Sequence, residues 1–181
     1  MNVLPTAYLG PASYFYRLQE PEAQIEVMES FEKQTFRNRC LITDTRGQAF
    51  RLTVPVKKSE HKQLTRDIEI SYQTRWQHQH WMALMSSYEH TPYFLYYADY
   101  FRPWYEREVK WLIDLNDGLT NVILDLLRNQ PPRGTQHLPH TEDWSTETWT
   151  DRHPWQKETS ILEQLFEHGP TTNVKRQTTN D

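Results

Sequence analysis

The sequence is poor in the residue types on which several common kinds of site depend. It has one cysteine in 181 residues, which excludes an internal disulfide and any metal site built from several cysteines. It has five glycines and no glycine-rich phosphate-binding loop. No apolar run reaches the length of roughly eighteen residues that a membrane helix needs, and the N-terminus lacks the pattern of a signal peptide. These absences predict a cytoplasmic protein with no membrane span, no metal ion and no cofactor.

Charge is distributed unevenly along the chain, whose net charge is -4. The part from Lys33 to Arg66, called the basic segment below, holds nine basic residues against Asp44 and Glu60, a local charge of +7. Because the chain has no glycine-rich loop, basic side chains would have to hold any bound anion, and arginine suits phosphate and carboxylate geometry. A solvated surface is the alternative interpretation. The acidic remainder and the absence of a nucleic-acid-binding motif argue against RNA or DNA as the partner.

Alternation of apolar and polar residues predicts strands in the first part of the chain. The best candidate is a hairpin that joins residues 33–42 to residues 49–56 across the turn DTRG. Shorter strands are expected at residues 24–31 and 67–72, where isoleucines and valines alternate with acidic residues.

Helical periodicity replaces this alternation from Thr74 onward. One helix carries Trp76, His80 and Tyr88 on a single face, and aromatic residues dominate a second helical stretch, residues 92–105. The clearest helix is expected at residues 106–128. A last helix should be capped by Ser160 and Glu163 and should end at Gly169.

These elements predict an α+β fold in a single domain, residues 1–170. A small, mainly antiparallel sheet from residues 24–72 would pack against the helices of residues 74–128 and the C-terminal helix. The acidic connection of residues 131–157 is either a functional loop or partly disordered. The tail, residues 171–181, is expected to be disordered.

Two residues could support catalysis, and each also has a structural interpretation. Cys40 has basic neighbours in the sequence, but Arg39 would point to the opposite face of a strand, so the thiol is more typical of a packed residue. His80 lies on the packed face of its helix, where most histidines are structural. Beside a basic sheet, however, it could act as a general base or bind a phosphoryl oxygen.

The order of several segments resembles the WbqC-like protein family. The segments are TAYLGPASYF, KQTFRNRCLI, RGQAFRLTVPV, DIEI, WQHQHW, TPYF and ETSILEQLFEHGP, which run over roughly residues 4–172. The resemblance implies a role in making bacterial surface polysaccharide such as O-antigen, with group transfer onto an activated sugar as one form of that role. Many relatives carry asparagine where this chain has Cys40, which argues further against a thiol mechanism.

The basic segment and the resemblance together predict one site. Lys33, Arg37 and Arg39 would bind a phosphate or carboxylate. Asn38 would orient a polar group, and His80 would act as an acid or base. A regular strand would place Asn38 and Arg39 on opposite faces, so this combined site requires a bulge.

The expected ligand is an anionic small molecule such as a nucleotide-sugar or an acyl donor. A non-enzymatic role stays open, either as an anion-binding module or as a scaffold in a polysaccharide assembly complex. For the scaffold, the tryptophan-rich loop of residues 144–155 would be the contact with a protein partner.

Overall fold

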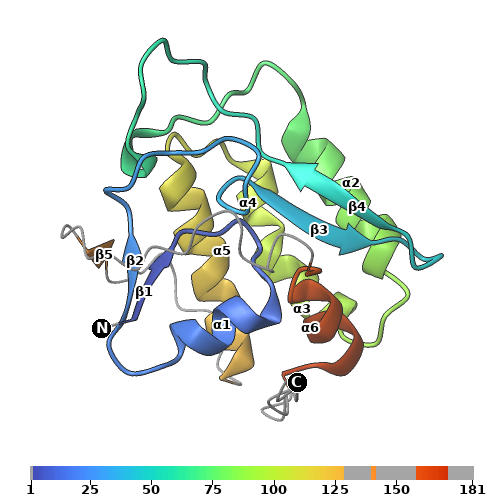
Figure 1. Ribbon diagram of the computed structural model, residues 1–181. Helices are drawn as coiled ribbons and strands as arrows, with labels where there is room; N and C mark the ends of the chain where they lie inside the picture. Colours follow the sequence, from blue (N-terminus) through green and yellow to red (C-terminus); the bar gives the residue numbers. More distant parts are fainter. Residues whose placement is uncertain (1, 129–139, 142–157, 171–181) are drawn as a thin grey trace.

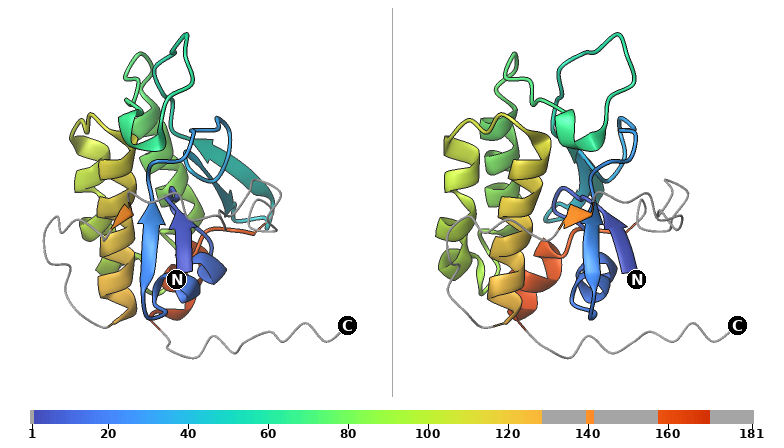
Figure 2. Two further views of the ribbon diagram at one scale, coloured as in Figure 1. Left: turned by 60° about the vertical axis from the view of Figure 1, so that its left-hand side comes forward. Right: turned by 90° about the vertical axis from the view of Figure 1, so that its left-hand side faces the viewer.

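Strands and helices form two layers in the computed structural model, which describes residues 2–128, 140–141 and 158–170 (Figure 1). Figure 2 shows the longer helices together on one side of the strands. The predicted α+β class is confirmed. The predicted tail, the loop of residues 144–155 and nearly all of the acidic connection lie outside the described residues.

A parallel sheet brings together strands from distant parts of the chain. Strand β2 lies between β1 and β5, and helix α1 connects β1 to β2, as a parallel connection needs a crossover. The predicted strand of residues 24–31 thus ends early and belongs to a parallel sheet. The bounds are β1 (Asn2–Pro5), α1 (Ala12–Leu18), β2 (Ala23–Glu26) and β5 (His140–Thr141).

The predicted hairpin is present as the antiparallel pair β3 (Arg39–Thr43) and β4 (Ala49–Thr53). Asp44 closes the turn, because its carboxylate accepts two backbone N–H groups at 2.8 and 2.9 Å. Residues 33–38 form turns, so the strand starts later than the alternation predicted. Residues 67–72 make isolated bridges in place of the third strand.

The two faces of the hairpin differ in burial. Cys40 and Ile42 point into the core, with Leu52 from β4 beside them. The register pairs Arg39 with Thr53 and Leu41 with Arg51. Arg39 and Arg51 therefore lie diagonally across the outer face. The Cα atoms of such diagonal neighbours are typically about 7–8 Å apart.

The helices form the second layer and follow the predicted order. Helix α5 begins later than expected, because the backbone around Lys110 first pairs with residues 68–70. The Lys110 carbonyl accepts the N–H of Ile70, and the N–H of Leu112 donates to the Ile68 carbonyl, both at 2.9 Å. The bounds are η1 (Thr65–Asp67), α2 (Trp76–Tyr88), α3 (Phe94–Phe101), α4 (Pro103–Glu106), α5 (Leu112–Leu127) and α6 (Leu162–His168).

Helix α6 ends as predicted, at Gly169, whose φ of 71° suits glycine. At its start Ser160 caps the helix as predicted, because its hydroxyl accepts the backbone N–H of Leu162 at 3.3 Å, but the Glu163 half of the capping box is replaced. In a capping box the Glu163 side chain would accept the backbone N–H of Ser160. Here that N–H donates instead to the Leu41 carbonyl of β3, at 2.7 Å. This bond holds the chain before α6 against the edge of the hairpin.

One apolar core joins the two layers. It includes Leu4 from β1, Ile42 from β3, Leu84 from α2 and Leu119 from α5, all almost fully buried. The hairpin is therefore fixed to the helices from its inner face, and its outer face is left to carry polar side chains. No helix within the described ranges is long and apolar enough to span a membrane.

Candidate functional site

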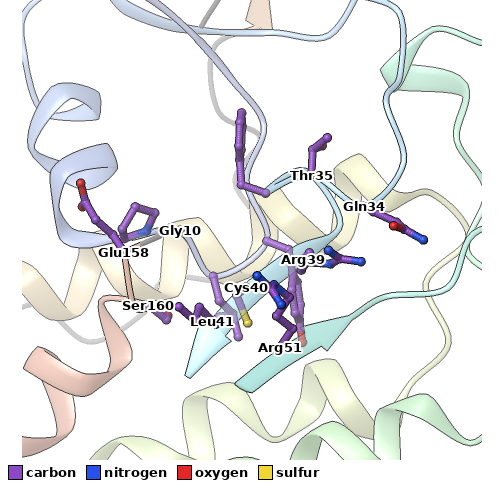
Figure 3. A pocket seen from close by; sticks show the side chains of 13 residues that line it. Gly10, Gln34, Thr35, Arg39, Cys40, Leu41, Arg51, Glu158 and Ser160 are labelled. Atoms are coloured by element: carbon purple, nitrogen blue, oxygen red, sulfur yellow. The ribbon is translucent and has the colours of Figure 1, made fainter. Parts of the chain in front are cut away.

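A pocket of about 70 Å³ opens beside the hairpin (Figure 3). Its walls come from residues 8–11, from parts of residues 34–41, from Arg51 and from the chain before α6. Three backbone hydrogen bonds hold these segments together: Tyr8 N to Phe36 O at 2.9 Å, Ser160 N to Leu41 O at 2.7 Å and Ile161 N to Gly10 O at 3.0 Å. The pocket is thus a product of tertiary contacts between distant parts of the chain.

Backbone strain marks the same pocket. Leu9 has a φ of 46° and Gln34 a φ of 63°, and both line it. Among the described residues, Glu22 is the one further non-glycine residue with a positive φ. A residue other than glycine rarely takes this conformation, and strained residues cluster at active sites and ligand-binding sites. The strain therefore supports this pocket as the functional site.

Two arginines form the positively charged part of the pocket. Arg39 is partly buried and its Nε donates to Thr53 Oγ1 at 3.2 Å, while Arg51 is exposed. Burial lowers the pKa of Arg39, and the nearby Arg51 guanidinium lowers it further. Repulsion between two like charges would be relieved by an anion bound between them. Arg39 and Arg51 are called the arginine pair below.

The arginine pair differs from several other residues of the basic segment in that neither arginine forms an ion pair with a described carboxylate. Arg37, Arg46, Lys57 and Arg66 each contact a carboxylate. In the described part of the chain, no carboxylate pairs with the remaining basic residues, which are Lys33, Arg39, Arg51, Lys58 and Lys62. Of these five, Arg39 and Arg51 line the pocket.

The structure places the other predicted substrate-binding residues outside the pocket. Arg37 is buried and holds Glu29 through two hydrogen bonds, Nε to Oε1 at 2.6 Å and Nη2 to Oε2 at 2.7 Å. Lys33 is exposed on the preceding turn, next to Gln34 but not among the pocket residues. The geometry therefore favours a structural role for Arg37 and leaves Lys33 at the periphery.

Asn38, predicted to orient a polar group, is buried and holds the turn in front of β3. Its side-chain Oδ1 accepts the N–H of Gln34 at 3.1 Å, and its Nδ2 donates to the Val54 carbonyl at 2.9 Å. Both ends of the amide are thus engaged in fixing the pocket wall. The arrangement supports Asn38 as a positioning residue for Gln34 and Arg39.

His80, the predicted acid or base, lies beneath the hairpin, also outside the pocket lining. The Tyr8 hydroxyl lies 2.8 Å from its Nδ1, and the Tyr105 hydroxyl lies 2.9 Å from that of Tyr8. Burial lowers the pKa of His80 to about 4, partly opposed by its hydrogen bond to the Thr53 backbone. The neutral ring thus donates to Thr53 and accepts from Tyr8. Its catalytic role stays a prediction, and it would have to give up one of these bonds to take part in chemistry.

Cys40 lines the pocket but has the properties of a packed residue. Its side chain is 7% exposed, and burial raises the pKa of the thiol well above its usual range. The thiol is therefore protonated at neutral pH, and the thiolate is the nucleophilic form. Within the described ranges, no three histidine, cysteine, aspartate or glutamate side chains are gathered to hold a metal ion.

Among the pocket residues that the sequence reasoning did not name, three carry a charged or amide side chain: Arg51, Gln34 and Glu158. Arg51 had a signal, since it alternates with Phe50 and Leu52 in a hairpin that also contains Arg39. Setting the register from the turn would have placed the two arginines on one face. Gln34 and Glu158 had no local signal, because a turn and a distant segment bring them to the pocket.

Comparison with known proteins identifies the family. The model of the WbqC-like protein family matches residues 7–151, which is most of the chain, and the protein belongs to this family. No curated protein and no solved structure matches the chain significantly.

Proposed function

We propose that the pocket binds the phosphate or carboxylate group of an activated donor, such as a nucleotide-sugar or an acyl donor, in bacterial surface-polysaccharide synthesis. The observation that carries the proposal is the arginine pair, two guanidinium groups at one pocket with no carboxylate partner among the described residues. Guanidinium groups bind phosphate and carboxylate through paired, charge-assisted hydrogen bonds. Membership of the WbqC-like family supports the polysaccharide setting.

The size of the pocket indicates which part of a donor it accepts. A volume of about 70 Å³ is room for several water molecules, which need roughly 10–15 Å³ each. Sites that enclose a whole drug-sized ligand are typically about 300–1,000 Å³. The pocket therefore takes a charged end group, and the remainder of a donor would lie over the outer face of the hairpin.

Transfer of a group from the bound donor is the finer form of the proposal. His80 and Asn38 are engaged in hydrogen bonds within the protein, so the present arrangement supports anion recognition more directly than acid–base chemistry. The scaffolding alternative depends on residues 144–155, which lie outside the described residues.

A thermal-shift screen tests the proposal. The panel holds inorganic phosphate, nucleotides, nucleotide-sugars, coenzyme A esters and short RNA. Ligands that bind the folded state raise the Tm by mass action, by the equivalent of about 2.7 kcal/mol at a hundred times Kd. We expect a nucleotide-sugar or acyl donor to raise the Tm of the wild type, and the double variant Arg39→Gln/Arg51→Gln to bind it at least about tenfold more weakly.

Arg46→Gln is the matched control. It removes one positive charge from the same hairpin, where the double variant removes two, and Arg46 lies in the exposed turn, outside the pocket. This variant should keep the full shift. No shift with any anion would overturn the proposal, and so would a shift that the double variant retains. Incubation of the best donor with candidate acceptors, followed by mass spectrometry, tests the transfer step separately.

A further inference from the structure

The pocket lies along the outer edge of β3, on the side away from β4. The carbonyl of Asn38, just before β3, accepts the N–H of Val54 at 2.8 Å, on the β4 side. The carbonyl of Leu41 accepts the N–H of Ser160 from the opposite side. Because alternate residues of an antiparallel strand turn toward its partner and away from it, Arg39 and Leu41 direct their backbone N–H and C=O groups away from β4.

Two hydrogen bonds bracket this part of the edge. The Phe36 carbonyl accepts the N–H of Tyr8 at 2.9 Å, and the Leu41 carbonyl accepts the N–H of Ser160 at 2.7 Å. Between them, the N–H and C=O of Arg39 and the N–H of Leu41 have no hydrogen-bond partner in the described part of the chain. These five residues all line the pocket. The pocket thus occupies the position in which a further strand would pair with β3.

The unpaired edge and the arginine pair meet in this pocket. Figure 3 shows Arg39, Cys40 and Leu41 in the middle of the pocket residues, with Gly10 and Ser160 on one side of them. A backbone N–H and two guanidinium groups suit a carboxylate, which only accepts hydrogen bonds. The Arg39 carbonyl, in contrast, needs an N–H donor. A ligand that satisfies every group of this edge therefore carries a donor next to its carboxylate.

We infer that the ligand of this pocket ends in an N-acylated amino acid residue. Its carboxylate binds the arginine pair and the Leu41 N–H, and its amide N–H donates to the Arg39 carbonyl. This inference rests on the proposed function for the anion site and names the chemical class of the charged end group. Main-chain hydrogen bonds to an exposed sheet edge are a general mode of peptide recognition. A free amine would bring an ammonium charge beside two guanidinium groups, which favours the acylated nitrogen.

The size of the pocket agrees with one terminal residue. A volume of about 70 Å³ has room for roughly five to seven water-sized groups, at 10–15 Å³ each. A carboxylate, its α-carbon and the adjoining amide are together of this size. The bonds from Tyr8 and Ser160 close the edge at both ends, so the terminal residue alone pairs with it. The remainder of the ligand would lie over the outer face of the hairpin.

The test compares two probes that differ in one hydrogen-bond donor, N-acetylglycine and acetoxyacetate. Both carry a carboxylate on the same skeleton, but acetoxyacetate has an ester oxygen in place of the N–H. Affinities for the full chain at pH 7.5 are measured by NMR titration of the ¹⁵N-labelled protein, which suits weak binding. We expect N-acetylglycine to bind about tenfold more tightly, because the ester leaves the Arg39 carbonyl without a donor. Glycine, with its free amine, should also bind about tenfold more weakly than N-acetylglycine.

Two proline variants test the edge itself. Proline removes a backbone N–H, and a strand tolerates it where that N–H points away from the partner strand. Leu41→Pro should weaken the binding of N-acetylglycine about tenfold. Ala49→Pro is the matched control, because Ala49 pairs with Thr43, so its N–H also points out of the hairpin, and it lies outside the pocket. This variant should bind N-acetylglycine as the wild type does.

A measurement on the wild type keeps the test decisive if Leu41→Pro does not fold. The N–H resonance of Leu41 should move on titration with N-acetylglycine, since a new hydrogen bond forms there. An unmoved Leu41 resonance at saturation would overturn the inference. An acetylated tripeptide ending in glycine identifies the source of the residue. Tighter binding than N-acetylglycine indicates a peptide terminus, and equal or weaker binding indicates a small N-acyl amino acid; both place the terminal residue at the edge.

The failures of the two proposals are distinguishable. If N-acetylglycine and acetoxyacetate bind equally well and both are weakened by Arg39→Gln, the inference is overturned and the anion site stands. The same holds if neither probe binds but a donor from the thermal-shift panel does, with the arginine pair required. If no anion of either experiment binds, the anion site and the inference fall together.

Discussion

At the scale of single residues, Thr53 connects the pocket to the hydrogen-bonded chain beneath it. Its hydroxyl accepts the Nε–H of Arg39 at 3.2 Å, and its backbone carbonyl accepts a hydrogen bond from His80. Tyr8 binds the other side of the His80 ring and also lines the pocket. His80 therefore supports the pocket from two directions without entering it, which makes it a positioning residue in this arrangement.

Cys40 gives a prediction at the same scale. Because burial raises the pKa of its thiol and leaves the side chain 7% exposed, we expect slow alkylation of the native protein. At pH 8, iodoacetamide should modify Cys40 at least about a hundredfold more slowly in the native protein than in urea. Mass spectrometry of quenched samples measures both rates.

The rate of Cys40 alkylation also discriminates between the two interpretations of this residue. Rapid alkylation of the folded protein, or loss of donor binding in Cys40→Ser, would restore the thiol as a functional candidate. Cys40→Ala is the control for packing, since it removes the sulfur without adding a polar group.

The candidate site shows what can be read from neighbouring residues in a sequence and what cannot. The basic segment predicted an anion site in the part of the chain where the pocket lies, and Arg39, which was named from it, lines that pocket. The sequence did not reveal the partners of the neighbouring side chains. Arg37 binds Glu29, and Asn38 binds the Val54 carbonyl across the turn. Each side chain had the right chemistry for a site, but a tertiary contact decided whether it was available.

At the scale of elements, local periodicity located the helices well and the strands less well. Helix α2 starts at Trp76 and α6 ends before Gly169, since these signals lie within one or two turns of the chain. The parallel sheet pairs Ile25 with His140, and no local pattern reveals a partner so far away. Segment 68–70 shows the same effect, because its pairing with Lys110 delays the start of α5.

Gly118 gives a prediction for the contact between α4 and α5. A Cβ atom at this position would lie 1.8 Å from the Trp104 ring, so the two helices approach closely because the side chain is absent. Glycine to alanine in a helix normally stabilises by about 1 kcal/mol. We expect Gly118→Ala instead to destabilise by about 3 kcal/mol or more, as overpacking forces the indole to move.

Urea denaturation followed by circular dichroism measures this change in the free energy of unfolding. Trp104→Phe in the same chain should relieve part of the loss, because the smaller ring leaves room for the methyl group. A double-mutant cycle then shows a favourable coupling between the two positions. A neutral or stabilising effect of Gly118→Ala alone would contradict the close contact.

At the scale of the whole molecule, the buried His80 ring links stability to pH. Burial lowers its pKa to about 4 in the folded protein, against an ordinary value of about 6.5 in the unfolded chain. Between these two values the unfolded chain binds more protons, so the free energy of unfolding falls as the pH falls through this window. A difference of this size corresponds to about 3 kcal/mol, present above pH 6.5 and lost by about pH 4.

Urea titrations at pH 7, 6, 5 and 4 measure this dependence in the wild type and in His80→Gln. The variant is expected to be less stable at pH 7, because it disturbs the hydrogen bonds to Tyr8 and Thr53. Its stability should nevertheless change much less between pH 6.5 and 4, since glutamine does not titrate. The partly exposed carboxylates of Asp44 and Glu69, whose pKa values are lowered by hydrogen bonds, remain in both proteins and cancel in the comparison. Parallel losses of stability in the two proteins would show that His80 is not the group that responds. A histidine NMR titration with its midpoint near pH 6.5 would place the ring in contact with solvent and contradict the buried chain of hydrogen bonds.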